Sequence, residues 1–198
     1  MWAQILNTVF TPIIIPTIGV ISILYLSNFR EFTNAQKLSL LWVFFSFSLL
    51  IPAALITMFR LYQGWSTSQV EQRERRTVPY TIAIVCYLFC YYLLCRHPFS
   101  FHFKSIIITA LIILVACSFI NQYTNISTHC AAMGGIIGLH LGYAFKLHFN
   151  PLGLLCILIL LAGIIGSCQI TLHKHTLSQT LIGYGTGIVA AVLTIFII

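Results

Sequence analysis

Seven mostly apolar stretches, each roughly 17 to 25 residues long, follow one another along the chain and limit its fold more than any other feature. They occupy residues 3–27, 38–60, 79–95, 103–120, 130–147, 151–168 and 177–198. A helix needs about 20 apolar residues to cross a bilayer, and a backbone inside the hydrocarbon must satisfy its own hydrogen bonds. We therefore expect an all-α, polytopic integral membrane helical bundle with six to seven transmembrane helices. The count is open because the third and fourth stretches are short and are joined by the polar sequence CRHPFSFHFK.

The chain forms a single unit in this interpretation. It contains no internal repeat, no low-complexity tract and no long linker, so we expect one membrane-embedded domain over residues 1–198. The first 27 residues lack a basic start and an A-x-A cleavage site, a pattern typical of a retained helix rather than of a signal peptide.

The charged residues exclude several kinds of chemistry. The chain has ten Lys and Arg residues but only three Glu and no Asp, which disfavours carboxylate-held metals and glycosidases that use two carboxylates. The basic residues are scattered over short loops, so we expect anionic lipid head groups and not nucleic acid as partners. The seven cysteines form no CxxC pair, and we interpret them as small core residues. No cofactor is expected.

Three loops gather the remaining polar chemistry on one side of the membrane. If all seven stretches cross it, the loops at 61–79, 121–129 and 169–178 emerge on the same face. Together they carry Arg73, Arg75, Arg76, His129, His173, Lys174 and His175. Each loop also precedes a helix, and helix N-termini together with Arg and Lys side chains bind anions, phosphate in particular.

Two imidazoles beside such an anion site can divide the roles of nucleophile and general acid, and this chemistry needs no metal. His175 and His129 are the candidates. His173 is more typical of a residue at the rim of a site, and His140, inside the fifth stretch, of a polar contact between helices.

The order of these groups resembles the type 2 phosphatidic acid phosphatases. That family has three motifs, K-x6-R-P, P-S-G-H and S-R-x5-H-x3-D, and shares its fold with vanadium haloperoxidases. Here the sequences EQRERRTVP (71–79), ISTH (126–129) and CQITLHKHTLSQ (168–179) are similar to them in that order, within a core at about 61–187.

The resemblance implies roles for individual residues. His175 takes the place of the phosphorylated nucleophile, His129 that of the general acid and Ser127 that of the motif serine. The phosphate-binding candidates are Arg73, Arg75, Arg76 and Lys174, with Ser127 beside them. The supporting positions depart from the family, because Gln169 replaces its Arg and Gln179 replaces its Asp. Gln179 is able to hold an imidazole through its amide oxygen but does not stabilise an imidazolium as Asp does.

Glycines predict which helices lie side by side. Gly134, Gly138 and Gly142 repeat every four residues in the fifth stretch, and Gly183 and Gly187 do so in the seventh. Such spacing allows close backbone approach in lipid. The helices that follow His129 and His175 should therefore pack together and bring the two imidazoles close.

The function expected from the resemblance is hydrolysis of a lipid phosphate or an isoprenoid diphosphate through a phosphohistidine, without a metal. Two alternatives stay open: a weak or inactive relative that binds anionic lipid, and a small transporter or metal-handling membrane protein. We expect a bacterial inner (plasma) membrane as the location. Five basic residues lie on each side, so the positive-inside rule does not orient the chain, although discounting charges used for binding would turn the site outward.

Overall fold

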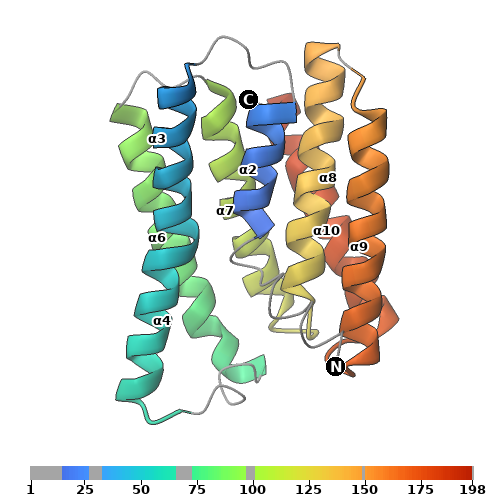
Figure 1. Ribbon diagram of the computed structural model, residues 1–198. Coiled ribbons are helices and arrows are strands. Elements are labelled where there is room, and N and C mark those ends of the chain that lie inside the picture. Colours follow the sequence, from blue (N-terminus) through green and yellow to red (C-terminus); the bar gives the residue numbers. More distant parts are fainter. Residues whose placement is uncertain (1–14, 27–32, 66–72, 97–100, 149, 198) are drawn as a thin grey trace.

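The computed structural model describes residues 15–26, 33–65, 73–96, 101–148 and 150–197, and these form an all-helical bundle (Figure 1). Seven helices run through the described residues: α2 (Ile15–Leu26), a continuous helix made of α3 (Asn34–Phe45), η1 (Ser46–Leu50) and α4 (Ile51–Tyr62), then α6 (Thr77–Arg96), α7 (Phe101–Ile120), α8 (Thr128–Leu147), α9 (Leu152–Thr171) and α10 (Leu177–Ile197). The single turn η2 (Arg73–Arg76) leads into α6. The expected all-α fold is confirmed, and the part of the first predicted stretch before Ile15 lies outside the described residues.

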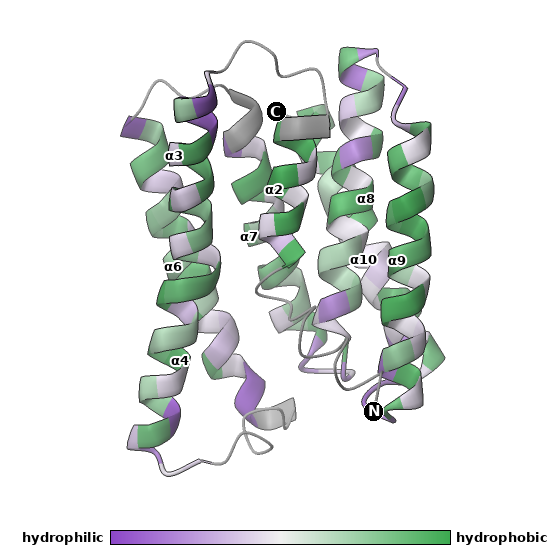
Figure 2. Ribbon diagram, viewed as in Figure 1, coloured by the Kyte–Doolittle hydropathy of each residue, from purple (hydrophilic) through white to green (hydrophobic). Residues whose placement is uncertain are grey.

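Five helices are long and apolar enough to cross a membrane. They are Asn34–Tyr62, Thr77–Arg96, Thr128–Leu147, Leu152–Thr171 and Leu177–Ile197, while Ile15–Leu24 and Lys104–Ile120 are shorter apolar segments. Hydrophobic residues cover the middle of the helices, and hydrophilic residues gather toward their ends (Figure 2). This distribution and these lengths suggest an integral membrane protein.

The helix from Asn34 to Tyr62 passes a proline without ending. Pro52 lacks an N–H group, and its ring would collide with the carbonyl of Ser48 in a regular α-helix. The widened π-turn η1 immediately precedes this position, and such turns interrupt the regular ladder of an α-helix without ending it. The Ser48 hydroxyl bonds to the Thr17 hydroxyl at 2.9 Å, which ties the turn to α2.

Helices α8 and α10 pack against each other through backbone. A Cβ atom added at Gly138 would lie 2.7 Å from the carbonyl oxygen of Ile188, and one added at Gly134 would meet the carbonyl of Tyr184. From the other side, a Cβ at Gly187 would meet the carbonyl of Ala131 and the amide of Gly135. The predicted pairing of these two helices is confirmed.

The largest core cluster joins α2, α3, α6, α7, α8 and α10. Its buried members include Leu24, Phe44, Leu94, Ile107 and Ile195. A second cluster packs α9 against α8, with Leu158 and Ile165 among its buried residues.

The seven cysteines differ in exposure: four are buried, two are exposed, and Cys168 is half-buried. All seven are free thiols, and Cys86, Cys90, Cys117 and Cys130 are buried as expected. The interpretation as core residues is wrong for Cys95 and Cys156, which are exposed on the outer faces of α6 and α9. In a bundle surrounded by lipid an outward position is also apolar, so composition does not separate it from the core.

Candidate active site

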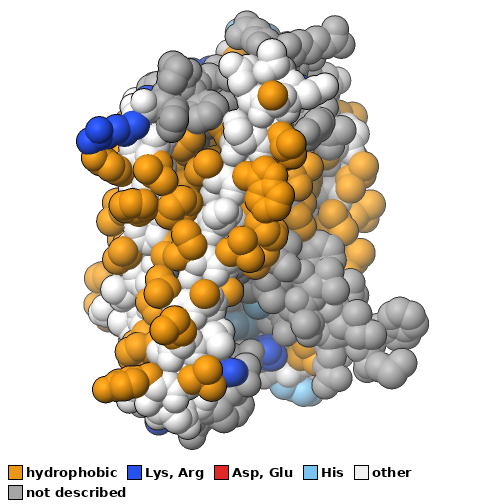
Figure 3. Space-filling view, turned by 60° about the vertical axis from the view of Figure 1, so that its left-hand side comes forward, with side chains coloured by type: hydrophobic (Ala, Val, Ile, Leu, Met, Phe, Trp, Pro, Cys, Tyr) orange, Lys and Arg blue, Asp and Glu red, His pale blue; other side chains and the backbone are white. Residues whose placement is uncertain are grey.

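The three motif loops meet at one end of the bundle and open into one cavity of about 580 Å³. Its polar lining comes from the end of α4, from η2, from the start of α8, and from the end of α9 with the loop that follows. The charged and imidazole-bearing residues of this lining are Arg60, Arg76, His129, Lys174 and His175. In Figure 3, basic and histidine side chains gather in a hollow at the lower end of the molecule, bordered by hydrophobic side chains.

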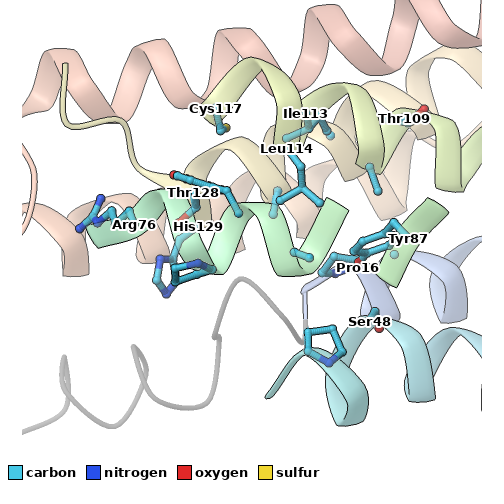
Figure 4. Close-up of a pocket in the computed structure, with 18 of the residues that line it drawn as sticks. Pro16, Ser48, Arg76, Tyr87, Thr109, Ile113, Leu114, Cys117, Thr128 and His129 are labelled. Carbon is cyan, nitrogen blue, oxygen red and sulfur yellow. The ribbon is translucent and has the colours of Figure 1, made fainter. Parts of the chain in front are cut away.

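The same cavity continues between the helices as an apolar compartment. Figure 4 shows Arg76 and His129 at one end and Ile113, Leu114 and Tyr87 further along. Other members of the apolar lining are Pro16, Pro52, Ala83, Ile106, Ala110, Ile136 and Leu139. Along α8 the lining runs from Thr128 to Leu139, a rise of about 16 Å. This is roughly half of the ~30 Å hydrocarbon thickness of a bilayer.

His175 is buried in the loop between α9 and α10, and its orientation is fixed. Its Nδ1 lies 2.9 Å from the backbone carbonyl oxygen of Asn125. A carbonyl only accepts, so Nδ1 carries the proton and Nε2 of the neutral ring holds the lone pair. The bend of the loop is set by His173, which has a φ of 53°, and by the carbonyl of Gln169, which accepts from the amide of Lys174 at 3.1 Å.

The surroundings of His175 favour the neutral imidazole. Burial lowers its pKa below the usual value, and the positive charges of Arg76 and Lys174 act in the same direction. The hydrogen bonds to the Asn125 carbonyl and to the Gln179 side chain oppose this shift, but the pKa stays lowered. A neutral ring is the form that acts as a nucleophile.

His129 is the second residue of α8 and borders the same cavity. Its Nε2 is buried and has no hydrogen-bond partner among the described residues. His175, Lys174 and Arg76 all interact with it electrostatically. The structure therefore brings the two predicted imidazoles to one site, together with two of the predicted cations.

Arg76 and Lys174 approach the site from opposite loops. The Nη1 of Arg76 donates to the Asn125 side-chain oxygen at 2.7 Å and to the Ile126 carbonyl at 3.4 Å. Arg60, in the last turn of α4, also lines the cavity and was not among the predicted site residues. In the sequence it stands at the end of an apolar stretch, where a basic residue is equally typical of the membrane boundary.

Two predicted phosphate-binding residues, Arg75 and Ser127, take other positions. Arg75 lies over the ring of Trp65, with its guanidinium carbon 4.6 Å from the ring centroid, and does not line the cavity. Ser127 is fully buried and its hydroxyl donates to the Cys130 sulfur at 3.2 Å, so Thr128 takes the place beside the cavity. The side chain of Arg73 lies outside the described part of the structure.

Gln169 and Gln179, the two predicted supporting residues, lie in different environments. Gln169 is buried and lines the cavity. The Gln179 side chain accepts from the amide of Thr176 at 3.1 Å, while its own amide donates to the Thr176 hydroxyl at 3.4 Å. This reciprocal pair is a capping box that starts α10 directly behind His175.

His173 is exposed and does not line the cavity, in agreement with a rim position. Asn125, which joins Arg76 to His175, was missed, and only its place four residues before His129 offered any signal.

Comparisons with known proteins assign no family. No protein family, curated protein or solved structure matches the chain. Within the described residues, no three His, Cys, Asp or Glu side chains lie close enough together to hold a metal ion.

Proposed function

We propose that the chain is an integral membrane phosphatase, a divergent relative of the type 2 phosphatidic acid phosphatases, which hydrolyses a lipid phosphate or an isoprenoid diphosphate through a phosphohistidine at His175. The observation that carries the proposal is the cavity, because one space of about 580 Å³ joins two imidazoles and three cationic side chains to an apolar compartment. A lipid phosphate has the same two parts, an anionic head and an apolar chain.

The polar end suits a phosphate group. Arg60, Arg76 and Lys174 bring three positive charges, and no acidic side chain of the described residues lines the cavity. Arginine forks match phosphate oxygens, and charge-assisted hydrogen bonds are the strong ones. Helix α8 begins beside this end without a side-chain cap, so its first-turn N–H groups add to the positive field.

The apolar end suits a chain that stays at membrane depth. The compartment follows α8 from Thr128 to Leu139, about 16 Å. Each CH₂ group buried from water contributes about 0.8 kcal/mol, so a chain in this space holds its head group at the cations.

In the first step the Nε2 of His175 attacks phosphorus. A nitrogen–phosphorus bond forms and the bond from phosphorus to the leaving oxygen breaks, while His129 gives its proton to that oxygen. The negative charge of the phosphate stabilises a protonated His129 among its cationic neighbours. Arg76 and Lys174 stabilise the charge on the transferring oxygens.

In the second step water attacks the phosphohistidine. His129, now neutral, accepts the proton of that water as a new phosphorus–oxygen bond forms and the nitrogen–phosphorus bond breaks. Inorganic phosphate leaves and His175 returns to its neutral form. No metal or cofactor takes part in either step.

The proposal is tested by phosphate release from purified protein in detergent. The substrates are phosphatidic acid, phosphatidylglycerol phosphate and a polyprenyl diphosphate, each with and without chelator, for wild type, His175→Ala and His173→Asn. His173 belongs to the same loop but is exposed, and Asn tolerates its positive φ of 53°. We expect His175→Ala to lose about 10³-fold or more, because a triad nucleophile costs that much, and His173→Asn to stay within about twofold.

The outcomes separate the alternatives. Two results together support the proposal. Label from a phosphate-labelled substrate is trapped on His175 at alkaline pH, and the release of phosphate is insensitive to chelator. Lipid that co-purifies with the protein but is never hydrolysed favours an anionic-lipid binding protein, and release that chelator abolishes favours a metal-dependent mechanism. Equal rates for wild type and His175→Ala overturn the assignment of the nucleophile.

A further inference from the structure

Among the described residues, Asn125 joins all three motif loops. Its backbone carbonyl accepts from Nδ1 of His175 at 2.9 Å, and its side-chain oxygen accepts from Nη1 of Arg76 at 2.7 Å. His175 comes just before α10 and Arg76 just before α6, so a single residue of the α7–α8 loop connects two elements that are far apart in the sequence.

The loop that carries Asn125 is anchored on both sides. The amide of Thr124 donates to the carbonyl of Ile120 at 2.9 Å, and the amide of Ile126 donates to the carbonyl of Thr124 at 2.9 Å. The Ile126 side chain is fully buried among α6, α7 and α8, next to Tyr80 and Cys117. The Asn125 carbonyl is therefore held by packing and not by the site itself.

We propose that Asn125 is a positioning residue, whose carbonyl presents the His175 ring with Nε2 toward the phosphate and whose side chain places Arg76 beside it. The catalytic part of this inference rests on the proposed phosphatase activity, whereas the tautomer and the hydrogen bonds do not.

A neutral acceptor at this point has a chemical consequence. A carboxylate in contact with Nδ1 would favour the charged imidazolium, but a carbonyl orients the ring without adding negative charge. The burial of His175 and the charges of Arg76 and Lys174 then keep its pKa lowered. The ring is thus oriented and still neutral when the substrate arrives.

The first test measures the tautomer and needs no activity. In protein labelled with ¹⁵N-histidine in detergent micelles, long-range ¹H–¹⁵N spectra identify the His175 ring by its loss in His175→Ala. We expect the proton on Nδ1 in the neutral ring, and a proton on Nε2 overturns the inference. The wild-type protein and His175→Ala differ only at His175. The other charged or titratable groups of the site, which are His129, Arg60, Arg76 and Lys174, are the same in both proteins.

The second test uses two substitutions at Asn125 and a control. Asn125→Asp keeps an acceptor for Arg76 but adds a negative charge, so we expect the pKa of His175, followed by the same spectra, to rise by about one unit or more. Asn125→Ala keeps the backbone carbonyl, so the tautomer should persist. The control is Thr124→Ala, because the Thr124 hydroxyl is buried without a hydrogen-bond partner among the described residues.

Kinetics separate positioning from a purely structural role. We expect Asn125→Ala to lower kcat/KM about tenfold in the wild-type background but to add little to the larger loss caused by Arg76→Ala, because the Asn125 side chain then has no guanidinium left to place. Fully additive losses, or a pKa of His175 that Asn125→Asp leaves unchanged, overturn the inference. If no lipid is hydrolysed but the spectra behave as expected, the phosphatase proposal fails while the positioning by Asn125 stands.

Discussion

The two long faces of α8 are built in opposite ways. One face is a row of Gly134, Gly138 and Gly142, and the backbone or side chains of α10 lie directly against it. The other face carries His129, Ala132 and other residues that line the cavity. One helix therefore separates the closest packing in the bundle from its hollow.

This difference assigns a separate task to each face. Contact between backbones leaves no side chain that is able to move aside, so the starts of α8 and α10 keep one fixed spacing. His129 and His175 lie at those two starts, and the packed face fixes their separation. The hollow face borders the cavity, where the proposed ligand has space.

The largest effect is expected from a substitution that disrupts the packed face of α8. A leucine at Gly187 would collide with the carbonyl of Ala131 and the amide of Gly135, neither of which is able to yield. We expect Gly187→Leu to lower the free energy of unfolding by about 3 kcal/mol or more. The measurement is thermal unfolding in detergent with the yield of monodisperse protein.

Gly185 provides the matched control two residues away. No atom lies within 4 Å of a Cβ built at Gly185, which is on the outer surface of α10. Gly185→Leu should therefore stay within about 0.5 kcal/mol of wild type. Equal destabilisation by both substitutions would show that α8 and α10 do not pack through their backbones at Gly187.

A substitution on the hollow face should change the preference for substrate chain length and leave the fold intact. Ala132 lines the apolar compartment, and a phenylalanine there would occupy the space that the proposed function assigns to the lipid chain. We expect Ala132→Phe to lower kcat/KM about 10- to 100-fold for long-chain phosphatidic acid, because several CH₂ groups lose their site at about 0.8 kcal/mol each. A water-soluble short-chain phosphate should be hydrolysed at nearly the wild-type rate.

Ala54→Phe is the control for this experiment, since Ala54 is exposed on α4 and does not line the cavity. Equal losses for long and short chains in Ala132→Phe, or the same pattern in Ala54→Phe, would contradict a chain-binding role for the compartment.

The packed face was predictable from the sequence, and the hollow only in part. Glycine spacing gave the contact of α8 with α10, and alternation of loops placed His129 and His175 at the same end. These features depend on residue type and spacing, which the amino-acid sequence shows directly. The cavity depends on where small side chains such as Ala83, Ala110 and Ala132 face one another, which requires the rotation of every helix.

Individual site residues were missed for specific physical reasons. Asn125 orients His175 through a backbone carbonyl, which every residue type possesses, so its letter carries no signal for that role. Ser127 was expected at the phosphate, but its hydroxyl turns to the Cys130 sulfur in the interior. Arg60 lies in the last turn of α4, before the loop that resembles the first motif.

The pH dependence of the site follows from the environment of His175. Burial, Arg76 and Lys174 lower its pKa, so the ring stays neutral at pH values where an exposed histidine, with a pKa of about 6.5, is charged. Because the proposed nucleophile is the neutral ring, the acidic limb of the kcat/KM profile should follow this lowered pKa. A profile between pH 4 and 8 checks this, and an acidic limb above about 6.5 would contradict it.

The same shift has a stability consequence with a defined sign. The unfolded chain binds a proton at His175 before the folded one does, so the contribution to stability is complete above about pH 6.5 and is lost as the pH falls through the folded pKa. In His175→Gln this part of the pH dependence of Tm should disappear, which separates His175 from the other histidines.

The smallest effect is expected from removing either of two tyrosine hydroxyls, one beside the hollow and one in the packed core. The Tyr80 hydroxyl is buried beside the cavity without a hydrogen-bond partner among the described residues, whereas the Tyr143 hydroxyl bonds to that of Ser105 at 2.6 Å within the packed core. Removing an unsatisfied buried hydroxyl relieves its desolvation, so Tyr80→Phe should stabilise the ligand-free protein by about 1 kcal/mol. Tyr143→Phe removes this formed hydrogen bond, so it should destabilise the protein by about the same amount. Thermal unfolding of the two variants should therefore give shifts of opposite sign, and shifts of the same sign would mean that the hollow and packed regions do not differ in how they satisfy polar groups.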